Sequence, residues 1–268
     1  MNWNAYGASL LETIRSSKPL VHHITNVVVT NDTANVTLHL GALPVMAHAV
    51  EEVAEMTAIA GALVLNIGTL SKHWVEAMVI AGKTANDKGI PIILDPVGAG
   101  ATQYRTETCH RLLEELSISV IRGNLGEVSI LAGLGGEVRG VESVSAGGEA
   151  VDVAKTLAQK QNCTVSITGK EDVISDGTRT VLVDNGHQWL TTLTGTGCSS
   201  TTAVAAFSAV EKDPVTASAC ALMCFGLAAE IAAPRAKGPA SFKTAFYDAL
   251  YNLNTRDIEQ GGRIREFS

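Results

Sequence analysis

The chain has 268 residues, of which 46% are apolar and only 18% charged, and its formal net charge at pH 7 is −7. This length suits one large α/β domain. No linker rich in proline, serine or charge divides the chain, so we expect a single domain over residues 1–268. An acidic balance without a Lys/Arg cluster excludes nucleic acid and anionic membranes as expected partners.

We expect a cytoplasmic protein. The first residues lack a signal sequence, and no apolar run looks long enough to cross a membrane. The cysteines form no Cys-x-x-Cys pair and no zinc spacing, which indicates reduced thiols: Cys109, Cys163, Cys198, Cys220 and Cys224. The surplus of apolar residues also favours a homo-oligomer.

The chain opens with alternating helical and strand-like segments. In order, we expect a helix at 4–17, a strand at 20–24, a helix at 27–40 ending at Gly41, a strand at 44–46 and a helix at 49–60. His22 and His23 are adjacent on the first strand and therefore point to opposite faces, which argues against a shared metal site.

The central region determines the fold class. Four short β-branched apolar runs lie at 62–67, 91–94, 117–121 and 164–167, and they alternate with polar-faced helices at 72–88, 107–116 and 148–161. This alternation is typical of βαβ units with right-handed crossovers. The sequence therefore predicts an α/β fold whose largely parallel central sheet has helices on both faces.

The last third is less regular. Runs at 173–175 and 180–184 flank Asp176-Gly177, which predicts a hairpin, and residues 184–187 give a second hairpin turn signal. A run of small residues at 198–207 indicates a tightly packed helix, and the chain from Pro214 onward is Ala-rich and helical.

Polar residues follow the central strands where each strand ends. In an open α/β sheet, ligands bind beyond the carboxyl ends of the strands. The residues found there are Asn66, Asp95, Arg122, Asn124, Glu127, Thr168, Gly169 and Lys170. Carboxylates, a guanidinium and hydroxyls at one edge are a plausible set for a metal–nucleotide site.

Each of these residues also has a purely structural interpretation. Asp95 and Glu127 suit Mg²⁺, which takes one or two carboxylates and keeps several waters. Alternatively, Asp95 is a turn residue before Pro96, and Glu127 lies in the first turn of a helix. Arg122 offers a planar fork suited to phosphate, or it forms an ion pair with Glu127.

The stretch Gly195-Thr196-Gly197-Cys198 precedes the small-residue helix. Glycines there allow close backbone approach to an anion, and the helix N-terminus adds partial positive charge. A plain tight turn has the same pattern, so this loop alone leaves phosphate binding and a turn equally open.

Together with Asn124-Leu125-Gly126-Glu127, this loop resembles the kinases of the ribokinase superfamily. Four further segments narrow the resemblance to the hydroxyethylthiazole kinases: 22–26, 41–48, 66–70 and 94–101. The resemblance implies a ribokinase-like fold and phosphorylation of 4-methyl-5-(2-hydroxyethyl)thiazole by ATP with Mg²⁺ in thiamine salvage. It also implies a homotrimer with active sites between subunits.

The resemblance also implies roles for particular residues. Arg122 and Thr168 contact ATP, and we group Asn124 with them. Asn26, Met46 and Gly195 line the thiazole pocket. Asp95 and Glu127 hold the metal, and the catalytic group consists of Thr194, Gly197 and Cys198.

Cys198 stands where most of the superfamily has aspartate. The thiol is either a thiolate base, its pKa lowered at the helix N-terminus, or a small residue that only lines the pocket.

Two other functions remain open from the sequence. A ribokinase-like ADP- or ATP-dependent dehydratase that repairs hydrated NAD(P)H shares the fold and loop, but it normally keeps the loop aspartate. A nucleotide-binding regulatory protein without turnover would tolerate the missing carboxylate.

Overall fold

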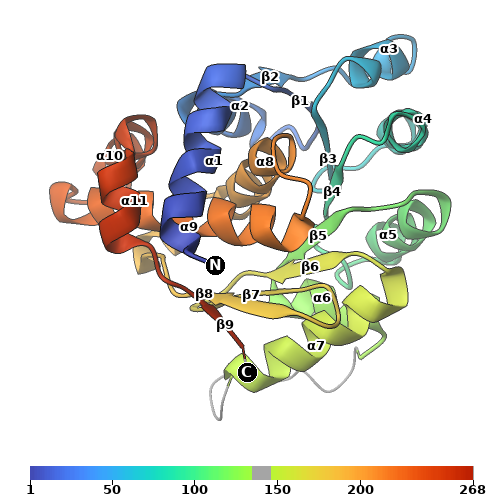
Figure 1. Ribbon diagram of the computed structural model, residues 1–268. Helices are drawn as coiled ribbons and strands as arrows, with labels where there is room; N and C mark the ends of the chain where they lie inside the picture. Colours follow the sequence, from blue (N-terminus) through green and yellow to red (C-terminus); the bar gives the residue numbers. More distant parts are fainter. Residues whose placement is uncertain (135–145, 268) are drawn as a thin grey trace.

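The computed structural model describes residues 1–134 and 146–267. These residues contain one nine-stranded sheet of order β2-β1-β3-β4-β5-β6-β7-β8-β9 (Figure 1). The strands from β2 to β6 are parallel, and the last three pair antiparallel. Their bounds are β1 Leu20–Ile24, β2 Leu43–Val45, β3 Ala62–Asn66, β4 Ile92–Asp95, β5 Val120–Gly123, β6 Thr164–Ile167, β7 Asp172–Ser175, β8 Thr180–Val183 and β9 Ile264–Glu266.

Helices cover both faces of this sheet (Figure 1). On β3, Val64 packs into the core under one group of helices and Leu65 into the core under the other, because successive side chains alternate between faces. The first group is α1 Trp3–Ser17, α2 Thr30–Leu40, α8 Thr196–Ser208, α9 Pro214–Ala232 and α10 Pro239–Asn252. The second is α3 Val53–Ala58, α4 Lys72–Lys88, α5 Gln103–Glu115, α6 Leu125–Ala132 and α7 Ala146–Gln161. The predicted fold class is confirmed.

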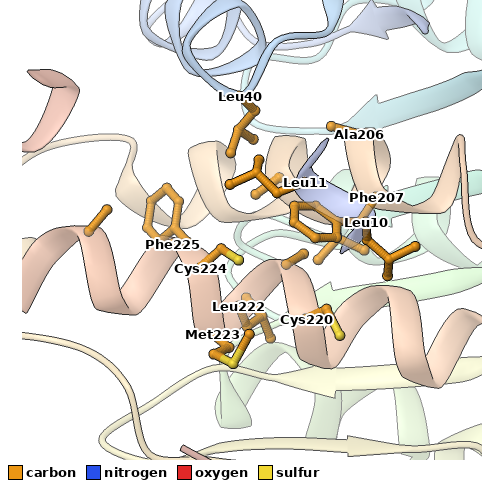
Figure 2. Close-up of a cluster of buried hydrophobic side chains, with 14 of the residues drawn as sticks. Leu10, Leu11, Leu40, Ala206, Phe207, Cys220, Leu222, Met223, Cys224 and Phe225 are labelled. Carbon is orange, nitrogen blue, oxygen red and sulfur yellow. The ribbon is translucent and has the colours of Figure 1, made fainter. Parts of the chain in front are cut away.

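Helix α9 lies at the centre of the first core. Figure 2 shows its side chains packed against α1, α2 and α8, with Cys220 and Cys224 fully buried among them. The helical segment Pro214–Arg235 has 22 residues and contains an 18-residue window of mean hydropathy 1.7, of which 89% is buried, so by length and composition it could span a membrane. The expectation that no apolar run reaches that length is therefore wrong. An all-round apolar helix that is buried forms a protein core.

Two predicted helices are shorter than the sequence indicated. The helix expected at 27–40 begins at Thr30, because the Val27 and Val28 amides donate to the side chains of Thr69 and Asn26, at 3.1 Å each. The helix expected at 49–60 is α3 Val53–Ala58.

The hairpin at Asp176-Gly177 is confirmed, with Gly177 at φ 93°. The second predicted hairpin, at 184–187, is wrong, because β8 takes β9 as its antiparallel partner. After β8 the chain instead enters the 3-10 helix η1 Gln188–Thr192. The side chain of Asn185 holds this loop by donating to the Gly261 carbonyl at 2.9 Å. The remaining short elements are η2 Ala233–Arg235 and α11 Thr255–Gly261.

Candidate active site

Three polar side chains stand in a row at the carboxyl edge of the sheet. Asn66 and Asp95 are the last residues of β3 and β4, and Arg122 is the next-to-last residue of β5. Each lies two residues after a core residue that packs on the α8 face. Strand alternation therefore directs all three toward α8. Sequence reasoning placed these residues at one edge, and the register now places them on one face.

The start of α8 lies over this row. Gly195 has φ 84° and caps the helix, and the first intrahelical hydrogen bond runs from the Ser199 amide to the Gly195 carbonyl at 2.8 Å. The amides of Thr196, Gly197 and Cys198 precede that bond, as in any helix N-terminus. A Cβ on Gly197 would lie 2.8 Å from Arg122 Nη1, so glycine lets the guanidinium and the helix start meet. A guanidinium beside a helix N-terminus is an arrangement that suits an anion.

Asp95 is buried at 1% exposure beneath this helix start. Its Oδ2 accepts hydrogen bonds from Asn66 Nδ2 at 2.6 Å and Thr201 Oγ1 at 3.0 Å. Burial raises the pKa of Asp95 to about 6, against the opposing effect of the Arg122 charge. Its Oδ1 is buried and has no hydrogen-bond partner in the described part of the chain.

That unpartnered oxygen fits a cation. Across residues 1–134 and 146–267, no three His, Cys, Asp or Glu side chains are grouped to hold a metal. A magnesium ion at Asp95 would therefore take one or two protein oxygens, with the rest of its ligands from water and phosphate, which is the ligand set that Mg²⁺ prefers.

Glu127 is the third residue of α6 and closes a capping box with Asn124. Glu127 Oε2 accepts from the Asn124 amide at 2.9 Å, while Asn124 Oδ1 accepts from the Glu127 amide at 2.9 Å. Glu127 Oε1 also accepts from the Gly98 amide at 2.8 Å. The first-turn interpretation of Glu127 is thus confirmed, and any metal contact would come in addition to it.

Arg122 does not pair with Glu127 or with any other carboxylate of the described residues. Its Nη2 donates to Thr168 Oγ1, and its Nε is buried without a partner among those residues. The ion-pair alternative is therefore wrong, and a buried guanidinium remains without an anionic neighbour in direct contact. Such a group favours an anionic ligand.

Arg122 and Thr168 line a pocket of about 760 Å³. This volume lies in the size range of sites for small molecules and cofactors. Thr196, Gly197 and Ser200 of α8 form one wall. The other walls consist of Gly169, Lys170, Asp172, Asn185, Gly186, His187, Gln188, Leu190, Thr191, Leu222, Phe225 and Gly226. Asn124 lies outside this wall, exposed at the start of α6.

Asn26 connects the row to Cys198. Its Nδ2 donates to Asn66 Oδ1 at 2.8 Å and lies 3.6 Å from Cys198 Sγ. Burial and the nearby Asp95 charge raise the pKa of the Cys198 thiol to about 12. Desolvation is the largest of these effects, and it favours the alternative in which Cys198 is a small residue lining the pocket over a thiolate base.

The remaining predicted residues lie around the α8 start or apart from it. Gly195 is its cap, and its close approach to Val29 leaves no room for a Cβ. Thr194 is exposed in the preceding turn, and Met46 follows β2, half-buried. None of these three lines the 760 Å³ pocket.

Sequence reasoning missed Thr201 and the bracing role of Asn66. Thr201 lies inside the small-residue helix, one turn after Gly197, and binds Asp95 from above. A hydroxyl one helical turn beyond a glycine loop could have been noticed, but its partner depends on the three-dimensional arrangement.

A family model described as the hydroxyethylthiazole kinase family matches residues 11–256. The chain belongs to the hydroxyethylthiazole kinase family. It is 87% identical over 268 residues to a hydroxyethylthiazole kinase of Desulfatibacillum aliphaticivorans, covering 100% of both chains. It is 60% identical to that of Chloroflexus aggregans, over 100% of this chain and 96% of the relative. The chain is thus a kinase, a phosphotransferase.

Solved structures agree with this membership. Hydroxyethylthiazole kinase of Pyrococcus horikoshii superposes with a TM-score of 0.91 at 45% identity, covering 98% of this chain and 99% of that one. Pyridoxal kinase of Staphylococcus aureus in complex with ADP gives a TM-score of 0.60 at 18% identity, covering 79% and 87%. The second similarity shows that the ribokinase-like fold is shared among these kinases.

Proposed function

We propose that this protein transfers the terminal phosphoryl group of ATP to the hydroxyl of 4-methyl-5-(2-hydroxyethyl)thiazole, in the cytoplasm, as a step of thiamine salvage. The observation that carries the proposal is the meeting of Arg122 with the Gly197 helix start above Asp95. Phosphoryl transfer needs mainly alignment and neutralised charge, which these groups supply together.

The pocket of about 760 Å³ would hold ATP, with Arg122 and Thr168 on the phosphates. The free amides at the start of α8 would stabilise charge on the transferred group. Mg²⁺, when bound, would neutralise charge on the phosphate oxygens. Asp95 would hold it through Oδ1, and Glu127 would take part directly or through water.

The thiazole alcohol would enter on the other side of the α8 start, beside Asn26, Gly195 and Met46. Methionine suits a small polarisable ring because its side chain is flexible and soft. With its pKa raised to about 12, Cys198 would serve as a neutral wall of the site. Thr194 would be a hydrogen-bond partner near the reacting groups.

A coupled assay of ATP consumption tests the reaction. The thiazole alcohol should support turnover, and hydroxymethylpyrimidine, pyridoxine and ribose should be poorer acceptors. Hydrated NADH tests the dehydratase function in the same assay. Faster turnover with ribose, or turnover only with hydrated NADH, would overturn the proposal.

The assembly is proposed to be a homotrimer that completes the thiazole site between protomers. Exposed apolar side chains near the α8 start, Val27 at 67% and Val28 at 61%, support a further protein contact there. Light scattering should give about three times the chain mass of 28.0 kDa. A fully active monomer at micromolar concentration would contradict it.

A further inference from the structure

The row of polar residues at the carboxyl edge continues past Arg122. Thr168 follows β6, the next strand, and Asp172 begins β7, the strand after that. Ile174, two residues after Asp172, packs into the core under α8 and α9, so alternation directs Asp172 to the same face as Arg122. Asp172 lines the 760 Å³ pocket.

The carboxyl group of Asp172 is held in place and has no ion-pair partner among the described residues. Its Oδ1 accepts a hydrogen bond from the Gly169 amide at 3.0 Å. No Lys or Arg of the described residues forms an ion pair with it. Burial raises its pKa to about 7, although the Gly169 amide and the Arg122 charge act in the opposite direction.

A carboxylate on the wall of a pocket for a polyanion repels phosphate. It therefore suits a neutral part of the ligand that carries hydrogen-bond donors. In a nucleoside triphosphate, those donors are the ribose hydroxyls and, in adenine, the exocyclic amine.

The order of residues along the pocket distinguishes these two parts. Strands lie about 4.8 Å apart, so the wall runs from Arg122 through Thr168 to Asp172 and then to Asn185 after β8. Beside Asn185, the wall is apolar, with Leu222 and Phe225 of α9. The cation, the carboxylate and the apolar wall follow one another along the pocket in the same order as the phosphates, the ribose and the base along a nucleotide.

We infer that Asp172 accepts hydrogen bonds from the ribose hydroxyls of the nucleotide and thereby makes this kinase select ribonucleotides over deoxyribonucleotides. This inference rests on the proposed function, because it requires the pocket to bind a nucleoside triphosphate. Asp172 is a specificity-determining residue on this account and takes no part in phosphoryl transfer.

Isothermal titration calorimetry with ATP, 2′-deoxy-ATP and 3′-deoxy-ATP tests the inference without requiring turnover. At pH 8, where the Asp172 carboxyl group is mostly ionised, the wild-type protein should bind ATP about tenfold or more tightly than at least one deoxynucleotide, as expected for a hydrogen bond to a charged group. Asp172→Ala should weaken ATP binding until the preference falls below about threefold, with little change for that deoxynucleotide. Kinase assays should show the same change in KM for ATP, with kcat changed less than about threefold.

Glu171→Ala is the matched control. Glu171 is the neighbouring acid on the same hairpin, pairs with Arg265 and does not line the pocket. It should retain the wild-type preference. If Asp172→Ala shows no cooperative thermal unfolding and is therefore not folded, Asp172→Asn, which keeps the side-chain shape, is measured in its place. It should show a smaller loss of preference in the same direction.

Equal binding of ATP and both deoxynucleotides by the wild-type protein would overturn the inference. Equal weakening of all three nucleotides in Asp172→Ala would assign the residue a structural role and also overturn it. Purine riboside triphosphate lacks the 6-amino group of ATP. If Asp172→Ala weakened the binding of ATP but not of this analogue, Asp172 would contact the base and not the ribose. No binding of ATP at all would refute the proposed function itself, whereas turnover of ATP without sugar preference would refute only this inference.

Discussion

Asn66 and Asp95 are register partners on adjacent strands, and Asn66 Nδ2 donates to Asp95 Oδ2 at 2.6 Å. The other end of the Asn66 amide accepts from Asn26 Nδ2 at 2.8 Å and from the Gly68 amide at 2.9 Å. The orientation of Asn66 is thus fixed by three hydrogen bonds. Asn66 in turn determines which Asp95 oxygen remains free.

Asn66→Ala should lower kcat by about 10- to 100-fold, because Asp95 loses the group that orients it. The unfolding free energy should fall by about 1–3 kcal/mol, since buried partners lose a hydrogen bond. Asn86→Ala is the control, because Asn86 similarly braces two elements through the Ser117 backbone, at 2.9 Å in both directions, away from the site. Steady-state kinetics measures kcat, and urea unfolding measures the unfolding free energy. A wild-type kcat in Asn66→Ala would contradict the bracing role.

Glu127→Gln should weaken the Mg²⁺ dependence of turnover and also lower the unfolding free energy by about 1–3 kcal/mol. The reason is that both carboxylate oxygens accept backbone amides, and an amide side chain replaces one acceptor with a donor. Glu55→Gln, at an exposed position of α3, should change neither quantity. Magnesium titrations and thermal melts separate the two effects. An unchanged magnesium titration would leave Glu127 as a helix cap only.

Arg122→Ala should raise the KM for ATP at least tenfold, because the guanidinium, whose planar fork suits phosphate, is removed from the pocket wall. The KM for the thiazole alcohol should change much less. Arg179→Ala is a suitable control, since Arg179 pairs with Asp213 and does not line the pocket. If the KM for ATP stayed at its wild-type value, Arg122 would have no part in nucleotide binding.

Cys198→Ala should keep kcat within about tenfold of wild type. Burial raises the pKa of the thiol to about 12, so the thiol is protonated at neutral pH and is a poor general base. The pH profiles of kcat for the wild-type enzyme and for Cys198→Ala should therefore have the same shape between pH 8 and 9. A loss above about a thousandfold with intact substrate binding would make the thiol a catalytic group.

His23 should make stability depend on pH. Burial lowers its pKa to about 3, whereas an unfolded histidine titrates near 6.5. Between these values the unfolded chain binds a proton that the folded chain does not, so the unfolding free energy falls as pH falls from about 6.5 to about 3. The slope from this residue is at most about 1.4 kcal/mol per pH unit.

His23→Gln should reduce that slope in urea unfolding between pH 4 and 6.5. The exposed His73→Gln variant on α4 should retain the wild-type slope. Equal slopes in all three proteins would show that His23 is not the group responsible.

The central parallel part of the fold, β3 to β6, could be predicted because these strands are fully buried. Such strands are continuous β-branched runs, and β6 coincides with its predicted bounds, as α4 does with its polar-faced pattern. Strand β9 could not be found this way, because Arg265 and Glu266 interrupt any apolar run and its partner β8 lies about 80 residues earlier. For the same reason the hairpin prediction at 184–187 was wrong.

The site could be predicted only in part. Residues at the carboxyl ends of buried strands, such as Asp95 and Arg122, were identified because parallel topology brings strand ends together. Asp172 was missed because it follows Lys170 and Glu171 and resembles a solvated turn acid. The pairing of Asn66 with Asp95 was missed because it depends on strand register, which periodicity does not determine.

Asn185 on the pocket wall binds residues far along the chain, since its Nδ2 donates to the Gly261 carbonyl at 2.9 Å and its Oδ1 accepts from the Arg263 amide at 2.7 Å. During synthesis, the loop at 185–188 therefore lacks its anchor until residues 261–263 have left the ribosome. A nascent chain that already contains Arg122, Thr168 and the α8 start still has one wall of the pocket unsupported. Support for this wall thus forms only after residues 261–263 have been made, and a chain truncated before residue 261 would lack it while most of the sheet remains encoded.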